Sequence, residues 1–131
     1  MKILLAIDGS ELSEAAVRSV IAQHRPQGTE VKVVHAIPVD VWDGKGSLAR
    51  ELVDRSSEAL RSAGFKVETT ILKGATSDAI IDAAAEWDAD LIVLDSHVRT
   101  AAKRFLFGSV SDAVVHQAHC SVELVRIRPL H

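Results

Sequence analysis

Two polar segments of the chain contain residue types that bind anionic ligands, and each follows an apolar run. The first is Asp8-Gly9-Ser10, and the second extends from Asp95 to Phe107. Gly108-Ser109 comes next and opens a segment of helical period. Because the free amides and the positive dipole end of a helix N-terminus attract phosphate groups, these segments are candidates for a phosphate or nucleotide site.

A third group of reactive residues, His116, His119 and Cys120, combines two imidazoles with a thiol. Two histidines three residues apart at a helix end lie close together, but a structural zinc ion normally needs four ligands. No partnering Cys or His pair has the required spacing, so the sequence predicts no metal site. Cys120 is the only cysteine, which excludes an intramolecular disulfide and indicates a small buried thiol that stays reduced.

Recognised motifs for catalysis are missing from the sequence. No G-x-S-x-G elbow follows a predicted strand. The segment GKGS at 44–47 lacks the first glycine of a Walker loop and is expected to begin a helix. His35 and His97 lie at the predicted ends of strands, but neither has an acidic partner at local spacing. We therefore expect no catalytic residues and no enzymatic activity.

The composition is that of one globular domain. The chain has 131 residues, 47% of them apolar and 25% charged, which suits a single domain over 1–131. A net charge of -3 provides no basic field for nucleic acid or an anionic membrane. No apolar run reaches the roughly 20 residues that cross a bilayer, and Asp8 interrupts the N-terminal run too early for a signal peptide. We expect a cytoplasmic protein.

Strand-like and helix-like segments alternate along the whole chain. The predicted strands, rich in β-branched residues, are Lys2–Ile7, Val31–Ala36, Lys66–Leu72, Leu91–Leu94 and Val122–Ile127. Residues of helical period lie between them, over 12–20, 48–63, 80–87 and 110–118. Such βα alternation predicts a three-layer α/β/α sandwich, Rossmann-like (flavodoxin-like), with a five-stranded parallel sheet and four helices.

The predicted fold also places the candidate site. Ser10, Ser47, Thr76 or Ser77, and Ser109 are typical starts of helices, and Gly64 is a typical end. In an open parallel sheet, ligands bind beyond the carboxyl ends of the strands, where the strand order reverses. The segments after the first and fourth strands, which begin at Asp8 and Asp95, are therefore expected to form the pocket.

Residues 91–126, LIVLDSHVRTAAKRFLFGSVSDAVVHQAHCSVELVR, resemble the C-terminal signature of the universal stress proteins. AIDGSELSEAAV at 6–17 and VVHAIPV at 33–39 are similar to the first and second strand ends of that family. The resemblance covers essentially the full chain and implies the same fold of five parallel strands and four helices. It also implies a cytoplasmic stress-response protein.

The resemblance fails at the phosphate-binding loop. ATP-binding members carry Gly, two residues, Gly, nine residues, and then Gly followed by Ser or Thr. Here that register reads Asp95, Ser96-His97, Val98, nine residues and Gly108-Ser109, so only the last element is kept. Glycine accepts a positive φ and lets an anion approach the main chain, and neither Asp95 nor Val98 offers this.

The two substitutions are expected to cost most of the affinity for a triphosphate. A carboxylate about 4 Å from a phosphate charge costs up to roughly 4 kcal/mol at an effective dielectric constant near 20, and a β-branched residue in a left-handed conformation adds about 1–2 kcal/mol. Arg99, Lys103 and Arg104 could offset the charge, but Arg99 is spaced to pair with Asp95 on a helical turn. We predict weak or absent ATP binding.

The remaining parts of the pocket leave two interpretations open. The predicted vestigial nucleotide site consists of Asp8, Ser96, His97, Gly108, Ser109, Val110 and Ser111. The resemblance implies that Asp8 contacts the adenosine portion, but an aspartate there also orders the following turn. Ser109 with Asp112 is likewise either an anion site or an ordinary helix cap. Binding of AMP or adenosine thus stays open, and no cofactor is expected beyond ATP or AMP at low affinity.

The last predicted strand supplies the expected partner. Ser121 to Arg128 should lie at an edge of the sheet, where its unpaired backbone groups can pair with another chain. The resemblance implies a homodimer formed there, across a two-fold axis. We therefore expect a non-catalytic stress-response or signalling dimer. The alternative is an adenine-nucleotide sensor or slow ATPase that uses Asp8, Ser109 and Ser111.

Overall fold

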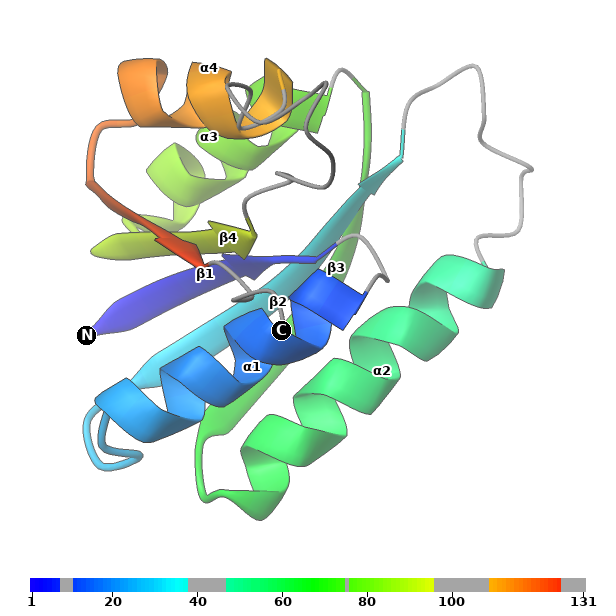
Figure 1. Cartoon of the computed structure of the whole chain (residues 1–131), viewed down its shortest axis with the longest axis vertical. Coiled ribbons are helices and arrows are strands. Elements are labelled where there is room, and N and C mark those ends of the chain that lie inside the picture. The colour runs from blue at the N-terminus through cyan, green and yellow to red at the C-terminus, as the bar shows by residue number, and fades with distance from the viewer. Residues whose placement is uncertain (8–10, 38–46, 75, 96–108, 126–131) are drawn as a thin grey trace, which may run out of the picture.

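The computed structural model describes residues 1–7, 11–37, 47–74, 76–95 and 109–125 of the chain. Strands and helices alternate along these residues, as Figure 1 shows. The elements are β1 (Lys2–Ala6), α1 (Glu11–Gln23), β2 (Glu30–Ile37), α2 (Ser47–Ser62), β3 (Lys66–Lys73), α3 (Thr76–Trp87), β4 (Leu91–Asp95), α4 (Ser109–Gln117) and β5 (Ser121–Val125). The predicted fold class is confirmed.

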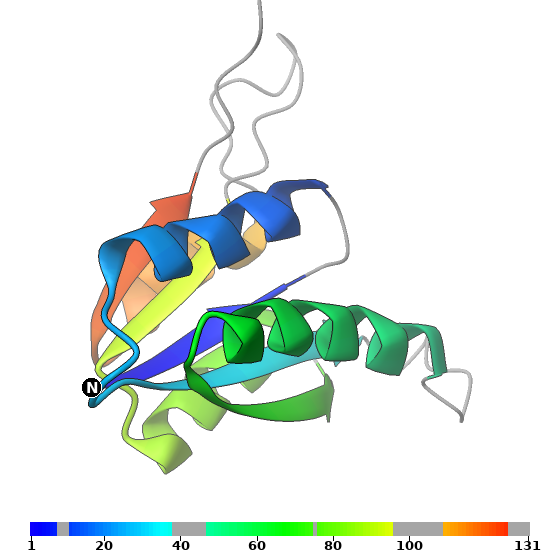
Figure 2. The same cartoon turned by 90° about the horizontal axis from the view of Figure 1, so that it is seen from below.

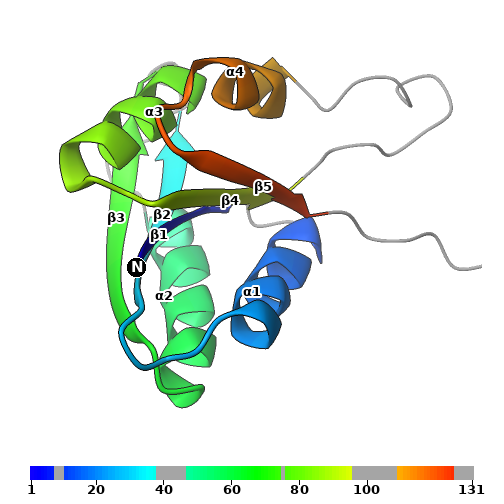
Figure 3. The same cartoon turned by 90° about the vertical axis from the view of Figure 1, so that its left-hand side faces the viewer.

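The five strands form one parallel sheet in the order β3-β2-β1-β4-β5. The chain moves outward from β1 to β3 on one side and then returns to build β4 and β5 on the other. The strand order therefore reverses between β1 and β4, which is the switch point predicted for a doubly wound sheet. Helices α1 and α2 cover one face of the sheet, and α3 and α4 cover the other (Figure 3).

Each face of the sheet has its own apolar core because side chains alternate along a strand. Ile3, Leu5 and Val33 are fully buried toward α1 and α2. Leu4 and Val34, also fully buried, pack toward α3 and α4. Strands buried on both faces read as near-continuous apolar runs, which explains why KILLA in β1 shows no polar alternation after its first residue.

The boundaries of the strands differ from the predicted ones by one or two residues, while α1 runs three residues past the predicted segment and α3 begins four residues before it, at the predicted cap Thr76. β1 ends at Ala6 rather than Ile7, β2 spans Glu30–Ile37, and β5 begins at Ser121. Residues 126–128, which belong to the predicted last strand, lie outside the described residues. Gly64 ends α2 as predicted, with a φ of 98°, a conformation that glycine adopts without steric cost.

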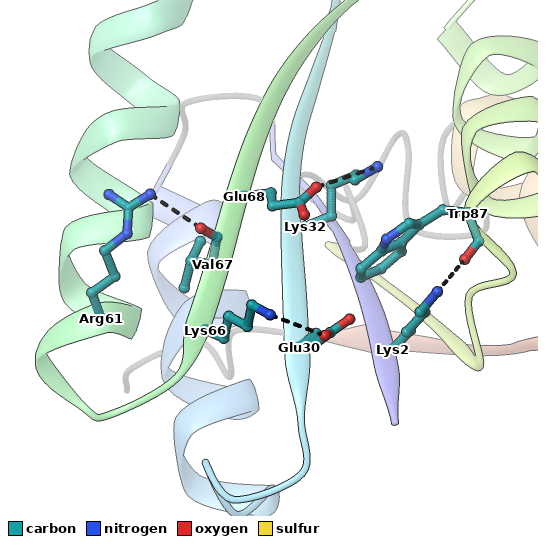
Figure 4. A network of polar contacts seen from close by, with 8 residues as sticks. All are labelled: Lys2, Glu30, Lys32, Arg61, Lys66, Val67, Glu68 and Trp87. Carbon is teal, nitrogen blue, oxygen red and sulfur yellow. Dashed lines mark hydrogen bonds and ion pairs between the residues drawn. The ribbon is translucent and has the colours of Figure 1, made fainter.

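A polar network covers the amino-terminal half of the sheet on the α3 side (Figure 4). Lys32 Nζ lies 3.7 Å from Glu68 Oε2 on β3, and it also lies 4.9 Å from the centre of the Trp87 ring. Lys2 Nζ donates to the Trp87 carbonyl at 3.2 Å. Lysines stacked on an indole are stabilised by the ring's negative face, so this network fastens the end of α3 to three strands.

Candidate functional site at the carboxyl edge of the sheet

The two segments predicted to form the site start side by side. β1 and β4 are neighbours in the sheet, and Ala6 of β1 pairs with Leu94 of β4. β1 and β4 therefore end side by side at the same edge of the sheet, and the next elements along the chain are α1 after β1 and α4 after β4 (Figure 2). This arrangement confirms the predicted position of the switch point.

The structure describes only part of the predicted vestigial site. Asp8, Ser96, His97 and Gly108 lie outside the described residues, and so does Val98. Ser109, Val110 and Ser111 form the first turn of α4. Ser111 is only 1% exposed, so its hydroxyl lies within the packed part of the molecule.

Asp95 is the residue that the sequence predicts at the position of the first glycine of the ATP-binding pattern. It is the last residue of β4, and it is in register with Val125 of β5. Its backbone is therefore extended and belongs to the sheet ladder, so β4 runs one residue further than Leu94, where the predicted strand ends. The positive φ that glycine would supply is thus not used at this position.

His35 has a partner that the sequence did not reveal. Its Nδ1 atom lies 2.7 Å from the carbonyl oxygen of Ile7. Since a carbonyl only accepts, Nδ1 must carry the proton and donate it to this bond. The amide of Ile7 donates to the Val34 carbonyl at 2.9 Å. Both backbone polar groups of Ile7 are thereby fixed, which sets the direction in which the chain leaves β1 toward Asp8.

The contact between His35 and Ile7 joins residues 28 positions apart in the sequence. At local spacing in the sequence, His35 has no acidic partner. The structure supplies a backbone partner from the neighbouring strand instead. The result is a positioning role for His35, and no catalytic one follows from this geometry.

The outer surface of α4 carries a polar contact between Asp112 and His116, which is an ion pair only when the imidazole is protonated. Asp112 Oδ1 lies 3.3 Å from His116 Nε2, and both side chains are mostly exposed. The Asp112 carboxylate, a predicted partner of Ser109, thus contacts the following turn of α4. Within the part of the chain that the structure describes, no three His, Cys, Asp or Glu side chains are grouped so that they could hold a metal ion.

Cys120 lies near the amino-terminal ends of the strands, whereas the candidate site is at their carboxyl ends. It lines a cleft of about 370 Å³ together with His119, Asp88 and Asp90. The thiol is half-buried, and that burial, followed by the charge of Asp90, raises its pKa. A raised pKa keeps the thiol protonated and unreactive.

No described helix is long and apolar enough to span a bilayer.

Comparison with known proteins gives a consistent result over nearly the whole chain. The model of the universal stress protein family matches residues 1–126. A universal stress protein of Methanocaldococcus jannaschii is 30% identical over 138 aligned positions, which cover 95% of this chain and 81% of that protein. A universal stress protein of Synechocystis is 29% identical, with 95% and 97% covered.

Solved structures agree with these sequence relatives. A universal stress protein from Archaeoglobus fulgidus superposes with a TM-score of 0.84 at 28% identity, covering 95% of this chain and 98% of that one. A universal stress protein of the same organism in complex with dAMP superposes with a TM-score of 0.78 at 28% identity, with 95% and 97% covered. The similarity therefore includes a protein that binds an adenine nucleotide.

Proposed function

The chain belongs to the universal stress protein family, and from this premise we propose a non-catalytic stress-response or signalling protein that acts as a homodimer. We further propose that it binds ATP weakly or not at all. The proposal rests on one observation. Asp95 and Val98 occupy the two positions where ATP-binding members of the family carry glycine.

The position of Asp95 in the fold supports this interpretation. The residue ends β4 beside β1, at the switch point of the sheet. A polyphosphate bound at this edge would meet a residue that carries a negative charge at the position where the ATP-binding pattern has glycine. The two negative charges repel each other, and Asp95 is in register with Val125 of β5, so its backbone is extended as part of the sheet.

In a second candidate function, the chain binds a nucleoside monophosphate but not a triphosphate. The relative from Archaeoglobus fulgidus in complex with dAMP is 28% identical to this chain, and the N-terminus of α4 is kept here with Ser109, Val110 and Ser111. A monophosphate needs less of the loop than a triphosphate does. This chain would then sense AMP or a related nucleotide through Asp8 and the first turn of α4.

Calorimetric titration with ATP and with AMP separates the two candidates. The first predicts no ATP binding tighter than 100 μM, which corresponds to about 5.5 kcal/mol. Tighter ATP binding would overturn it. AMP binding below 100 μM in the absence of comparable ATP binding would favour the second candidate instead.

A reversion experiment tests the reason that we give for weak ATP binding. D95G/V98G should bind ATP at least tenfold more tightly than the natural chain, because it removes a charge and restores backbone freedom. D95N/V98G is the matched control, since it removes the charge but leaves a side chain at 95. If D95G/V98G binds ATP no better than the natural chain, the two residues are not the cause.

A further inference from the structure

β5 lies at the edge of the sheet, and beyond it the described residues contain no further strand. Its side chains alternate between the two faces. Val122 and Leu124 pack on the α3 and α4 side, and Val125 packs on the α1 and α2 side. All three are half-buried, so a second strand added at this edge would cover apolar surface.

Glu123 is the exception in the middle of this strand. Its Oε2 atom accepts a hydrogen bond from Ser19 Oγ of α1 at 2.9 Å, so the half-buried side chain is directed toward α1. No ion pair joins Glu123 to a basic side chain among the described residues. An inward-pointing charge on an edge strand is a known obstacle to further pairing, because pairing would bury it.

The position of the two-fold axis determines which residues of the two β5 strands lie opposite each other, and Glu123 lies at the centre of the full register. When two copies of an edge strand pair antiparallel in one continuous sheet, residues that face the same side lie opposite each other. The axis must therefore pass through one residue, which meets its own copy. For the five residues Ser121–Val125, only an axis at Glu123 pairs the whole strand.

That full register is favourable for every residue except the central one. It places Val122 opposite Leu124 of the second copy on the α3 and α4 side. It also places the two Glu123 side chains on the same face, with Cα atoms about 4.5–5.5 Å apart. An axis at Val122 or Leu124 separates the carboxylates but pairs only three of the five residues.

We propose that Glu123, held inward by Ser19, is a specificity residue that limits pairing of β5 with a second copy of this chain and opposes its full five-residue register. This inference rests on the homodimer in the proposed function. It concerns how tightly and in which register that dimer forms, and it leaves nucleotide binding untouched.

The first test measures the dimer dissociation constant by sedimentation equilibrium for the natural chain, E123Q and E68Q. E123Q keeps the shape of the side chain and removes its charge, and we expect it to dimerise at least about tenfold more tightly. E68Q is the matched control, because it makes the same change in net charge on β3 at the other edge. It should dimerise like the natural chain.

The salt dependence of the dimer dissociation constant is a second measurement, and a purely structural effect of the substitution would not change it. Raising NaCl to about 0.5 M screens repulsion between charges, so it should tighten the natural dimer more than the E123Q dimer.

The dissociation constants also separate this inference from the proposed dimer. If E123Q dimerises no more tightly than the natural chain, the inference is wrong and the proposed dimer is unaffected. A monomeric natural chain with a dimeric E123Q would support the inference but contradict the proposed dimer, and two monomers would remove both.

A cross-linking experiment tests the register itself. In a C120S background, S121C/V125C places thiols at positions that lie opposite each other only in the full register. Within one strand these positions are too far apart to join. The covalent dimer should form readily when E123Q is added and poorly with Glu123 present. If it forms equally in both, Glu123 does not oppose the full register.

Discussion

The two edge strands of the sheet, β3 and β5, place their charged side chains differently. On β3, the exposed side chains of Lys66 and Glu68 each pair with an opposite charge on β2, Lys66 with Glu30 at 3.6 Å and Glu68 with Lys32 at 3.7 Å. On β5, the one charged residue points inward and meets only the Ser19 hydroxyl among the described residues. The β3 edge is thus polar on its surface, and the β5 edge is apolar with an internal charge.

The backbone of β3 is protected as well. Arg61 of α2 donates from Nη2 to the carbonyl of Val67 at 3.1 Å, as Figure 4 shows. Its Nη1 donates to the fully buried hydroxyl of Ser57 at 3.3 Å. A side chain that occupies a carbonyl of an edge strand removes an acceptor that another chain would need. The comparison teaches that β3 has a side chain on one of its edge carbonyls, whereas the charged residue of β5 within Ser121–Val125 is Glu123, which bonds to Ser19.

The largest expected effect comes from placing a carboxylate on each of the two edge strands, β5 and β3. L124D puts a carboxylate among the half-buried apolar residues of the α3 and α4 side and should lower the free energy of unfolding by about 2–4 kcal/mol. K66D puts one on β3, where the side chain is 77% exposed, and should cost less than about 1 kcal/mol even beside Glu30. Urea denaturation measures both, and equal losses would contradict the difference between the edges.

Removal of the backbone cap on β3 should have an intermediate effect. R61A loses the bonds to Val67 and Ser57, and we expect a loss of about 1 kcal/mol in the free energy of unfolding. R55A, which removes an exposed arginine from the same helix, is the control and should change it by less than about 0.5 kcal/mol. Indistinguishable denaturation midpoints for R61A and R55A would show that the cap does not stabilise β3.

Reversing a surface charge on β3 should have a smaller effect. E68K places two lysines opposite each other on β2 and β3 and should cost about 0.5–1 kcal/mol. Adding K32E restores an opposite pair, but it also removes the lysine above Trp87, so recovery should be partial. A double-mutant cycle isolates the pair, and a coupling energy of zero would mean that the pair does not help to align the strands.

The smallest effect concerns Cys120, which immediately precedes β5. Burial and then Asp90 raise the pKa of its thiol above the ordinary value of 9.0, so alkylation of the folded protein should still be rising with pH above 9. Because the folded state holds this proton more tightly, its small contribution to stability is present below the ordinary pKa and is lost as pH rises through the folded pKa. The unfolded chain in denaturant is the reference, and identical pH profiles would exclude the shift.

The fold was predictable because its signals are local. Apolar runs with β-branched residues marked all five strands, and Gly64 marked the end of α2. The boundaries moved by a residue or two, since a strand ends where its ladder ends. At Asp95 the pairing with Val125 extends β4 through a carboxylate, which propensity alone would have assigned to a loop.

The candidate site was predictable only as a location. The adjacency of β1 and β4 confirms where the two segments begin, and the identities of Asp95 and Val98 come directly from the sequence. The bond from His35 to Ile7 could not be predicted, because it depends on the register of two strands rather than on spacing along the chain.

The sequence by itself determined the alternation of strands and helices and the family, and the loss of the phosphate-loop glycines stays a prediction. Only the tertiary structure decided the direction of Glu123. A charged residue between Val122 and Leu124 is typical of a strand with one face in solvent, yet here it lies against α1 and bonds to Ser19, 104 positions away. Periodicity is encoded by neighbours in the chain, whereas such a contact exists only after distant elements have packed together.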